Sequence, residues 1–257
     1  ATKIGGESVL LTFHPHPRMV LFPDDEDLKL LSTREEKIKR LESAGLDHLI
    51  IYPFSRKFSR RTATEYVRDL LVNEIGVKTL VIGYDHQFGR NREGNFEQLI
   101  ELAGIYDFKL EEIPAQELDD VKVSSTKIRN ALLKGDVKTA SKYLSHDYKV
   151  SGIVVKGRQL GRELGFPTAN ISVLDRYKLI PGDGVYAVNV KVNKGNFKGM
   201  LNIGYRPTVG GLYKATMEVN IFEFNENIYG HFIGVEFVKR LRDEIKFDSV
   251  EELKIQL

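Results

Sequence analysis

The sequence contains no cysteine, which excludes disulfide bonds, thiolate metal ligands and redox chemistry through thiols. A chain without disulfides is consistent with a reducing cytosol, so we expect a cytoplasmic protein. The sequence also lacks any apolar run near the roughly 18 residues of a membrane span, and its first residues lack the apolar centre of a signal peptide. We therefore expect no contact with a membrane.

The sequence has almost no excess of charge of one sign, because its 38 Lys and Arg residues nearly balance its 36 Asp and Glu residues and give a net charge of +2. This balance argues against nucleic acid as a partner, although residues 56–61 form a local basic run that suits a nucleotide. The 257 residues, 42% of them hydrophobic, indicate roughly two domains with ordinary cores. We expect a monomer or a weak oligomer.

The first part of the chain alternates apolar strand-like runs with helical stretches, a rhythm typical of a parallel α/β sheet. Thr62 and Glu65 form a capping-box signature at the start of one helix. Ser124 or Ser125 caps a helix that runs to Lys134, and with the helix opened by Asp136 it is expected to close this domain. The expected strands are residues 9–13, 49–52, 79–82 and 108–113, and the expected earlier helices are residues 33–43, 63–74 and 95–103.

From residue 148 onward the pattern is that of an antiparallel β module. In the strand expected at residues 215–222, Glu218 and Asn220 point to one face, and Met217, Val219 and Ile221 point to the other. On pattern alone this favours an ordinary solvent-facing glutamate over a catalytic one. The expected strands are residues 149–155, 185–192, 197–203, 215–222 and 231–241, and residues 249–252 indicate a final helix through a capping box.

A glycine-rich loop precedes two polar residues at the spacing of a strand face. Gly157, Gly161 and Gly165 let backbone N–H groups turn toward an anion, and neighbouring basic residues add positive charge. Thr168 and Asn170 point to one face of an extended segment, and two such oxygens suit a magnesium ion that keeps most of its waters. A surface loop followed by a strand explains the same pattern equally well, since isolated glycine motifs are common.

Three polar segments of the first domain are placed to meet a nucleotide. His14 and His16 follow a strand, where ligands of open α/β sheets gather, and the rigid His-Pro-His run disfavours a zinc site. Residues 83–89 follow another strand and suit a flat ligand, although a turn-rich βα connection is the alternative. Residues 124–129 place hydroxyl and N–H groups at a helix N-terminus, which suits a triphosphate, and helix capping alone explains only the serines.

Residues 161–170, G-R-E-L-G-F-P-T-A-N, resemble the flavokinase signature of riboflavin kinases. The resemblance continues through residues 181–186, 202–208 and 241–244. Upstream, residues 83–89 and 124–129 resemble the nucleotidyltransferase half of the bacterial bifunctional riboflavin kinase/FMN adenylyltransferases. The similarity therefore spans nearly the whole chain.

The resemblance implies a Rossmann-like nucleotidyltransferase domain over residues 1–147 and an antiparallel riboflavin-kinase β-barrel with a C-terminal helix over residues 148–257. It implies phosphorylation of riboflavin to FMN by ATP with magnesium, and adenylylation of FMN to FAD with release of pyrophosphate. Flavins and adenine nucleotides are then the partners. The alternative is a flavin-binding or regulatory protein with an inert transferase half, since fold does not guarantee activity.

The resemblance also implies roles for single residues. Glu218 is implied to take the proton from the terminal ribityl hydroxyl as that oxygen attacks the γ-phosphate of ATP, and Thr168 and Asn170 are the implied magnesium ligands. The other implied contacts are Gly157, Gly161, Arg162, Gly165 and Thr168 for ATP in the kinase half, Asn202 and Arg242 for flavin, and His16, Asp85, Phe88, Ser124, Ser125, Thr126 and Arg129 for ATP or flavin in the adenylyltransferase half.

This sequence departs from the family pattern at several places. The family often has histidine where this chain has Asn220, and on charge pattern alone Arg242 serves equally well in an ion pair with Asp243 or Glu244. The family's G-x-F-D-G-x-H-x-G-H loop would lie before residue 1. We therefore expect a stretch truncated at its N-terminus, in which adenylylation depends on that loop.

Overall fold

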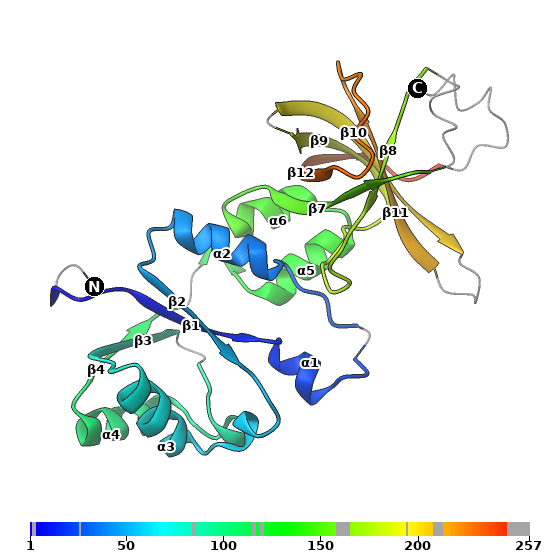
Figure 1. The fold of residues 1–257 in the computed structure, drawn as a ribbon. Helices are drawn as coiled ribbons and strands as arrows, with labels where there is room; N and C mark the ends of the chain where they lie inside the picture. Colours follow the sequence, from blue (N-terminus) through cyan, green and yellow to red (C-terminus); the bar gives the residue numbers. More distant parts are fainter. Residues whose placement is uncertain are drawn as a thin grey trace. The chain divides into compact units, whose positions relative to one another are not determined.

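The computed structural model describes residues 1, 4–25, 27–83, 86–114, 117–118, 121–157, 165–193, 195–207 and 213–245. The chain divides into two compact units (Figure 1), of which the first combines Ala1–Leu28 with Arg34–Lys122, and the second combines Lys29–Thr33 with Val123–Leu257. The helices expected to close the first domain thus group with the second unit. The domain boundary between residues 147 and 148 stays a prediction.

The first unit contains two parallel strand pairs, as the alternating pattern predicts. Strand β1 (Val9–His14) pairs with β2 (His48–Pro53), and β3 (Thr79–Gly83) pairs with β4 (Lys109–Ile113). A buried cluster that includes Val67, Ile82, Leu99 and Phe108 forms the core. The other elements of this unit are α1 (Pro17–Leu21), α2 (Arg34–Ser43), η2 (Phe58–Arg60), η4 (Arg90–Arg92), α4 (Phe96–Tyr106) and the short hairpin of β5 (Glu117–Leu118) and β6 (Val121–Lys122).

The helix predicted over residues 63–74 begins as predicted but does not continue as a regular α-helix. A turn of α-helix, α3 (Ala63–Glu65), leads into a π-helix, η3 (Tyr66–Glu74). The capping box is confirmed, because Thr62 Oγ1 accepts from the Glu65 N–H at 3.2 Å and Glu65 Oε2 accepts from the Thr62 N–H at 2.8 Å. The hydrogen bond from the Thr62 backbone lowers the pKa of Glu65.

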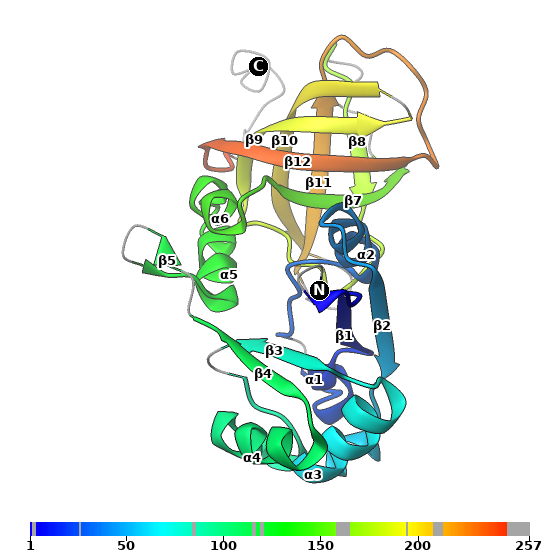
Figure 2. The same cartoon turned by 90° about the vertical axis from the view of Figure 1, so that its left-hand side faces the viewer.

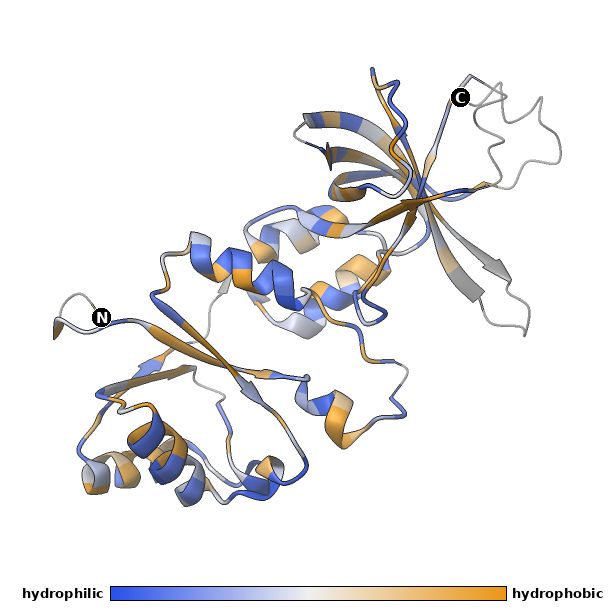
Figure 3. Ribbon diagram, viewed as in Figure 1, coloured by the Kyte–Doolittle hydropathy of each residue, from blue (hydrophilic) through white to orange (hydrophobic). Residues whose placement is uncertain are grey.

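The second unit is built on a closed antiparallel barrel of six strands in the order β10-β11-β8-β7-β12-β9 (Figure 2). Apolar and polar residues alternate along the strands (Figure 3), and the interior residues Val150, Leu201, Val219 and Phe237 are completely buried. The antiparallel β prediction is confirmed. The strands are β7 (Tyr148–Val155), β8 (Ala169–Ser172), β9 (Gly184–Val192), β10 (Gly195–Pro207), β11 (Tyr213–Ile221) and β12 (Phe232–Arg242).

Two helices pack against this barrel, α5 (Ser125–Leu133) and α6 (Val137–Leu144). Their buried faces belong to the same apolar cluster as the barrel interior, and α6 contacts β7 and β12. Ser124 caps α5 by accepting from the Lys127 N–H at 3.3 Å, and Asp136 caps α6 by accepting from the Thr139 N–H at 3.1 Å. Both predicted helix starts are confirmed. The final helix predicted near residues 249–252 lies outside the described residues.

The segment Lys29–Thr33 joins the barrel unit through a buried lysine. Lys178 is only 4% exposed, and its ammonium donates to Leu31 O at 2.8 Å and lies 4.4 Å from the ring centre of Tyr148. Backbone hydrogen bonds between Leu30 and the neighbours of Lys178 add to this contact. Within the described part of the chain, no helix is long and apolar enough to cross a membrane.

We predict that Lys178→Met destabilises the barrel unit, because the partly buried Leu31 O loses its donor, at a cost of up to about 1–3 kcal/mol. Thermal unfolding followed by circular dichroism measures the effect as a lower midpoint. The matched control is Lys198→Met on an exposed strand position, which should leave the midpoint unchanged. Equal midpoints for both variants would contradict a stabilising role of Lys178.

Candidate functional site

Three polar residues form a row across neighbouring barrel strands. The strand register pairs Glu218 on β11 with Asn170 on β8 and with Asn202 on β10. Directly paired residues point to the same face, with Cβ atoms about 4.5–5.5 Å apart. Since Val219 and Leu201 beside them point into the barrel and are buried, the row lies on the outer face. The barrel thus brings together three residues that are distant in the sequence.

The row continues toward Arg242 at the end of β12. Asn202 pairs with Val185 on β9, and Val185 pairs with Arg242. The Arg242 side chain donates to Asp243 O at 3.1 Å, and it is Arg240 that forms an ion pair with the Asp243 carboxylate, at 2.6 Å. The pairing of β12 with β9 is irregular between Arg240 and Arg242, so the register brings Arg242 near Asn202 without fixing the face of its side chain, and its flavin role stays a prediction.

Thr168 lies beside this row, at the entrance to β8. It precedes the strand by one residue, and its neighbour Pro167 accepts a hydrogen bond from the side chain of Asn220 at 2.8 Å. Asn170 shares a face with Glu218 through the strand register, and Thr168 stands two residues before it in the sequence, directly ahead of β8. The oxygen donors predicted for magnesium are therefore next to the predicted base.

Gly157 leaves space for the side-chain amide of Asn170. A Cβ atom at Gly157 would come within 2.6 Å of Asn170 Cγ, a distance that real Cβ contacts do not show. A side chain at this position would have to displace the Asn170 amide, so glycine leaves that amide its space. Gly165 has a φ of 83°, which favours glycine. Gly161 and Arg162, also predicted for this loop, lie outside the described residues.

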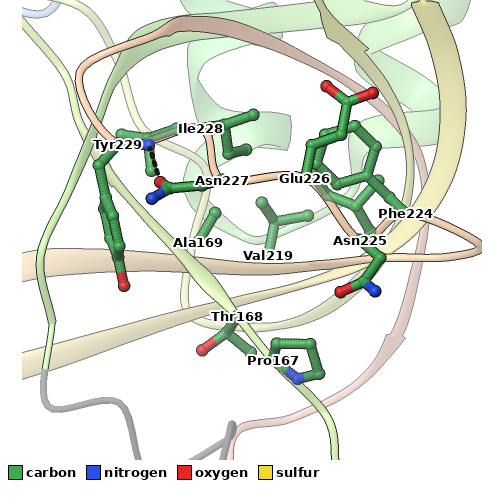
Figure 4. Close-up of a pocket in the computed structure, with 12 residues that line it drawn as sticks. Pro167, Thr168, Ala169, Val219, Phe224, Asn225, Glu226, Asn227, Ile228 and Tyr229 are labelled. Atoms are coloured by element: carbon green, nitrogen blue, oxygen red, sulfur yellow. Dashed lines mark hydrogen bonds between the residues drawn. The ribbon is translucent and has the colours of Figure 1, made fainter.

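A pocket of about 370 Å³ opens next to Thr168 (Figure 4). Pro167, Thr168 and Ala169 form one side, and residues 224–229 between β11 and β12 form another. Asn227 holds this second wall in shape, because its side chain accepts from the Tyr229 N–H at 3.2 Å. The volume and the mixed polar and apolar lining suit a small organic ligand. Sequence reasoning missed this wall, since Asn225–Asn227 indicated only a turn.

The predicted adenylyltransferase residues fall in both units. In the first, His16 follows β1 and caps α1 by accepting from the Arg18 N–H at 3.2 Å. Phe88 is buried, with Gly94 tight against its ring and His86 stacked on it at 6.0 Å. Its role as a ligand contact stays a prediction. Asp85 lies outside the described residues.

The residues predicted to bind a triphosphate lie together at the start of α5, in the second unit. Ser125 and Thr126 are exposed in the first helical turn, directly after the cap residue Ser124. Arg129 lies one turn further, and its Nε donates to Lys29 O at 2.9 Å. The exposed hydroxyl and N–H groups of this turn lie at a helix N-terminus, where an anion could bind, and triphosphate binding there stays a prediction.

Comparison with known proteins identifies the family. The family model for riboflavin kinase matches residues 144–257, and the family model for FAD synthetase matches residues 1–127. Bifunctional riboflavin kinase/FMN adenylyltransferases are 39% identical in Haemophilus influenzae, covering 100% of this chain and 82% of that protein, and 35% identical in Bacillus subtilis, covering 100% and 81%. The chain belongs to the bifunctional riboflavin kinase/FMN adenylyltransferase family.

A solved structure agrees with this family fold over the whole chain. A protein named "Macrolide-efflux Protein from Streptococcus pneumoniae" has a TM-score of 0.90 and 35% identity, and the match covers 100% of this chain and 82% of that one. Its name refers to efflux, whereas the sequence relatives and both family models refer to flavin-nucleotide enzymes. Within this family, the row on the barrel is the candidate kinase site.

We predict that Gly157→Ala displaces the Asn170 side chain, because the added methyl group would occupy its place. The measurement is the side-chain amide signal of Asn170 in a ¹H–¹⁵N spectrum, assigned by its loss in Asn170→Ala. Gly104→Ala in α4 is the control, since no atom lies within 4 Å of the added group. An unshifted Asn170 signal in Gly157→Ala would show that the loop yields instead.

Proposed function

We propose that the barrel unit phosphorylates riboflavin to FMN with ATP, and that the protein also adenylylates FMN to FAD with release of pyrophosphate. The observation that carries the proposal is the row of Asn170, Glu218 and Asn202 on neighbouring barrel strands, with a pocket of about 370 Å³ next to Thr168. Family membership supports both reactions. Retention of Thr168, Asn170 and Glu218 favours an active kinase over a flavin-binding protein with an inert transferase half.

In the proposed kinase reaction, the Glu218 carboxylate accepts the proton of the terminal ribityl hydroxyl. The hydroxyl oxygen then bonds to the γ-phosphorus while the bond from that phosphorus to the bridging oxygen of ADP breaks. Phosphoryl transfer needs mainly positioning and charge neutralisation from a protein. A carboxylate on a rigid strand, flanked by two amide side chains, supplies such positioning.

The oxygen donors next to Glu218 fit a magnesium ion. Thr168 offers a hydroxyl and Asn170 an amide oxygen on one face of the extended segment, and magnesium prefers such hard ligands while keeping several waters. When bound, the ion neutralises charge on the transferred phosphoryl group. Thr168 and Asn170 would hold it beside the phosphates, with the base of the nucleotide in the pocket walled by residues 224–229.

The flavin is proposed to lie along the other side of the row, toward Asn202 and Arg242. The register places Arg242 two strands from Asn202 around the barrel. Its guanidinium is suited to hydrogen bonding or to stacking on a flat ring system. This arrangement puts the ribityl end between the isoalloxazine ring and Glu218.

For adenylylation, the first turn of α5 is proposed to bind the triphosphate of ATP. Ser124, Ser125 and Thr126 supply hydroxyl and N–H groups, and the helix dipole favours the negative charge. The Arg129 guanidinium would add its Nη groups, since its Nε donates to Lys29 O. Within the first unit, His16, Asp85 and Phe88 stay the proposed ATP or flavin contacts. We further propose that the protein works on these small molecules in the cytoplasm.

We predict that Glu218→Gln lowers FMN formation about 100- to 10,000-fold, the usual contribution of a general base. Riboflavin binding, followed by flavin fluorescence, should remain intact because the amide keeps the shape of the side chain. FMN and FAD are separated by chromatography after incubation with riboflavin, ATP and magnesium. The control is Glu236→Gln on β12, where the carboxylate pairs with Lys191. Unchanged turnover in Glu218→Gln would remove this residue from the mechanism.

We predict that Thr126→Val raises the KM for ATP in FAD formation from supplied FMN by about 10-fold, because one hydrogen bond to a charged phosphate is lost. FMN formation from riboflavin should be unchanged, since Glu218 and its neighbours are untouched. Thr139→Val in the first turn of α6 is the matched control. An equal KM for ATP in both variants would exclude the α5 turn from triphosphate binding.

A further inference from the structure

The backbone pairing between β8 and β11 ends just before Thr168. Two residue pairs join these strands, Glu218 with Asn170 and Val219 with Ala169. Continuing the same antiparallel register places Asn220 opposite Thr168. Beyond the last backbone pair, a side chain links the two segments, because Asn220 Nδ2 donates to Pro167 O at 2.8 Å.

This hydrogen bond holds the residue next to Thr168, which is one of the two proposed magnesium ligands. Thr168 lies between Ala169, which is paired with Val219, and Pro167, whose carbonyl is held by Asn220. Strand β8 has only four residues and pairs with β11 over two of them, so its entrance would otherwise fray. With both flanking residues held, Thr168 stays beside Asn170 and Glu218.

We propose that Asn220 is a positioning residue of the phosphoryl-transfer site, which holds Thr168 and Asn170 in place against the Glu218 strand. The inference rests on the proposed kinase function. Neither a proton transfer nor a ligand contact is assigned to Asn220. Its amide N–H is the functional group, and a histidine ring N–H at this position could donate to the same carbonyl.

A purely structural role for Asn220 leads to a different expectation. The residues of β11 that stabilise the barrel are Met217, Val219 and Ile221, which are buried, whereas Asn220 is partly exposed on the outer face. Removing its amide leaves the barrel core untouched. The loss of one neutral hydrogen bond should therefore appear in the kinetics of the site, as a change of about 3- to 10-fold.

The test compares three variants in the full chain. Asn220→Leu keeps the size of the side chain but removes the donor, and Asn220→His restores a donor. Asn189→Leu is the control, because it makes the same Asn-to-Leu substitution at an outward position of β9. Asn220→Thr, too short to reach Pro167 O, serves as a second donor-free variant should the leucine impair folding. The readouts are kcat and KM for magnesium-ATP in FMN formation, riboflavin affinity and the unfolding midpoint.

We expect kcat/KM for magnesium-ATP to fall about 3- to 10-fold in Asn220→Leu and Asn220→Thr, with riboflavin affinity unchanged and the unfolding midpoint lowered by no more than the loss of one exposed hydrogen bond. Asn220→His should recover to within about twofold of the parent, and Asn189→Leu should match the parent. Parent-like kinetics in the donor-free variants, or a parallel loss of stability and riboflavin affinity, would overturn the positioning role. A parent protein that forms no FMN would overturn the proposed function itself, and this inference with it.

Discussion

The register of β8, β11 and β10 is the constraint on which the candidate kinase site depends. Because strand side chains alternate, a slip of one residue would turn Glu218 into the barrel and Val219 out to solvent. Burial of Met217, Val219 and Ile221 prevents this, since each buried apolar side chain contributes about 1.5–3 kcal/mol and a buried carboxylate would be costly. Burial of the apolar residues inside the barrel therefore determines that Glu218 lies on its outer face.

Local patterns in the sequence were sufficient for most elements and for the face of the strand that carries Glu218. The alternation around Glu218 correctly predicted its position opposite the buried residues, and the caps at Thr62, Ser124 and Asp136 were all confirmed. The expected strands do not include β8, because its four residues follow a glycine-rich loop. Its assignment comes from barrel closure, which pairs it with β7 and β11.

Features that depend on long-range contacts could not be predicted from the sequence. The pairing of Glu218 with both Asn170 and Asn202 follows from barrel topology, and family resemblance gave their roles without their arrangement. The pocket wall at residues 224–229 carries only turn signals. The grouping of Lys29–Thr33 with the barrel depends on the buried Lys178, whose partner Leu31 is far away in the chain. The π-helix η3 likewise has no local sequence signal that sets it apart from an α-helix.

The most direct test of this account is a crystal structure of the protein with riboflavin, magnesium and a non-hydrolysable ATP analogue. The account predicts that the terminal phosphate lies beside Thr168 and Asn170, with the ribityl hydroxyl within hydrogen-bond distance of the Glu218 carboxylate. The base of the nucleotide should fill the pocket walled by residues 224–229. A nucleotide bound elsewhere on the barrel, with Glu218 facing neither ligand, would contradict the central claim.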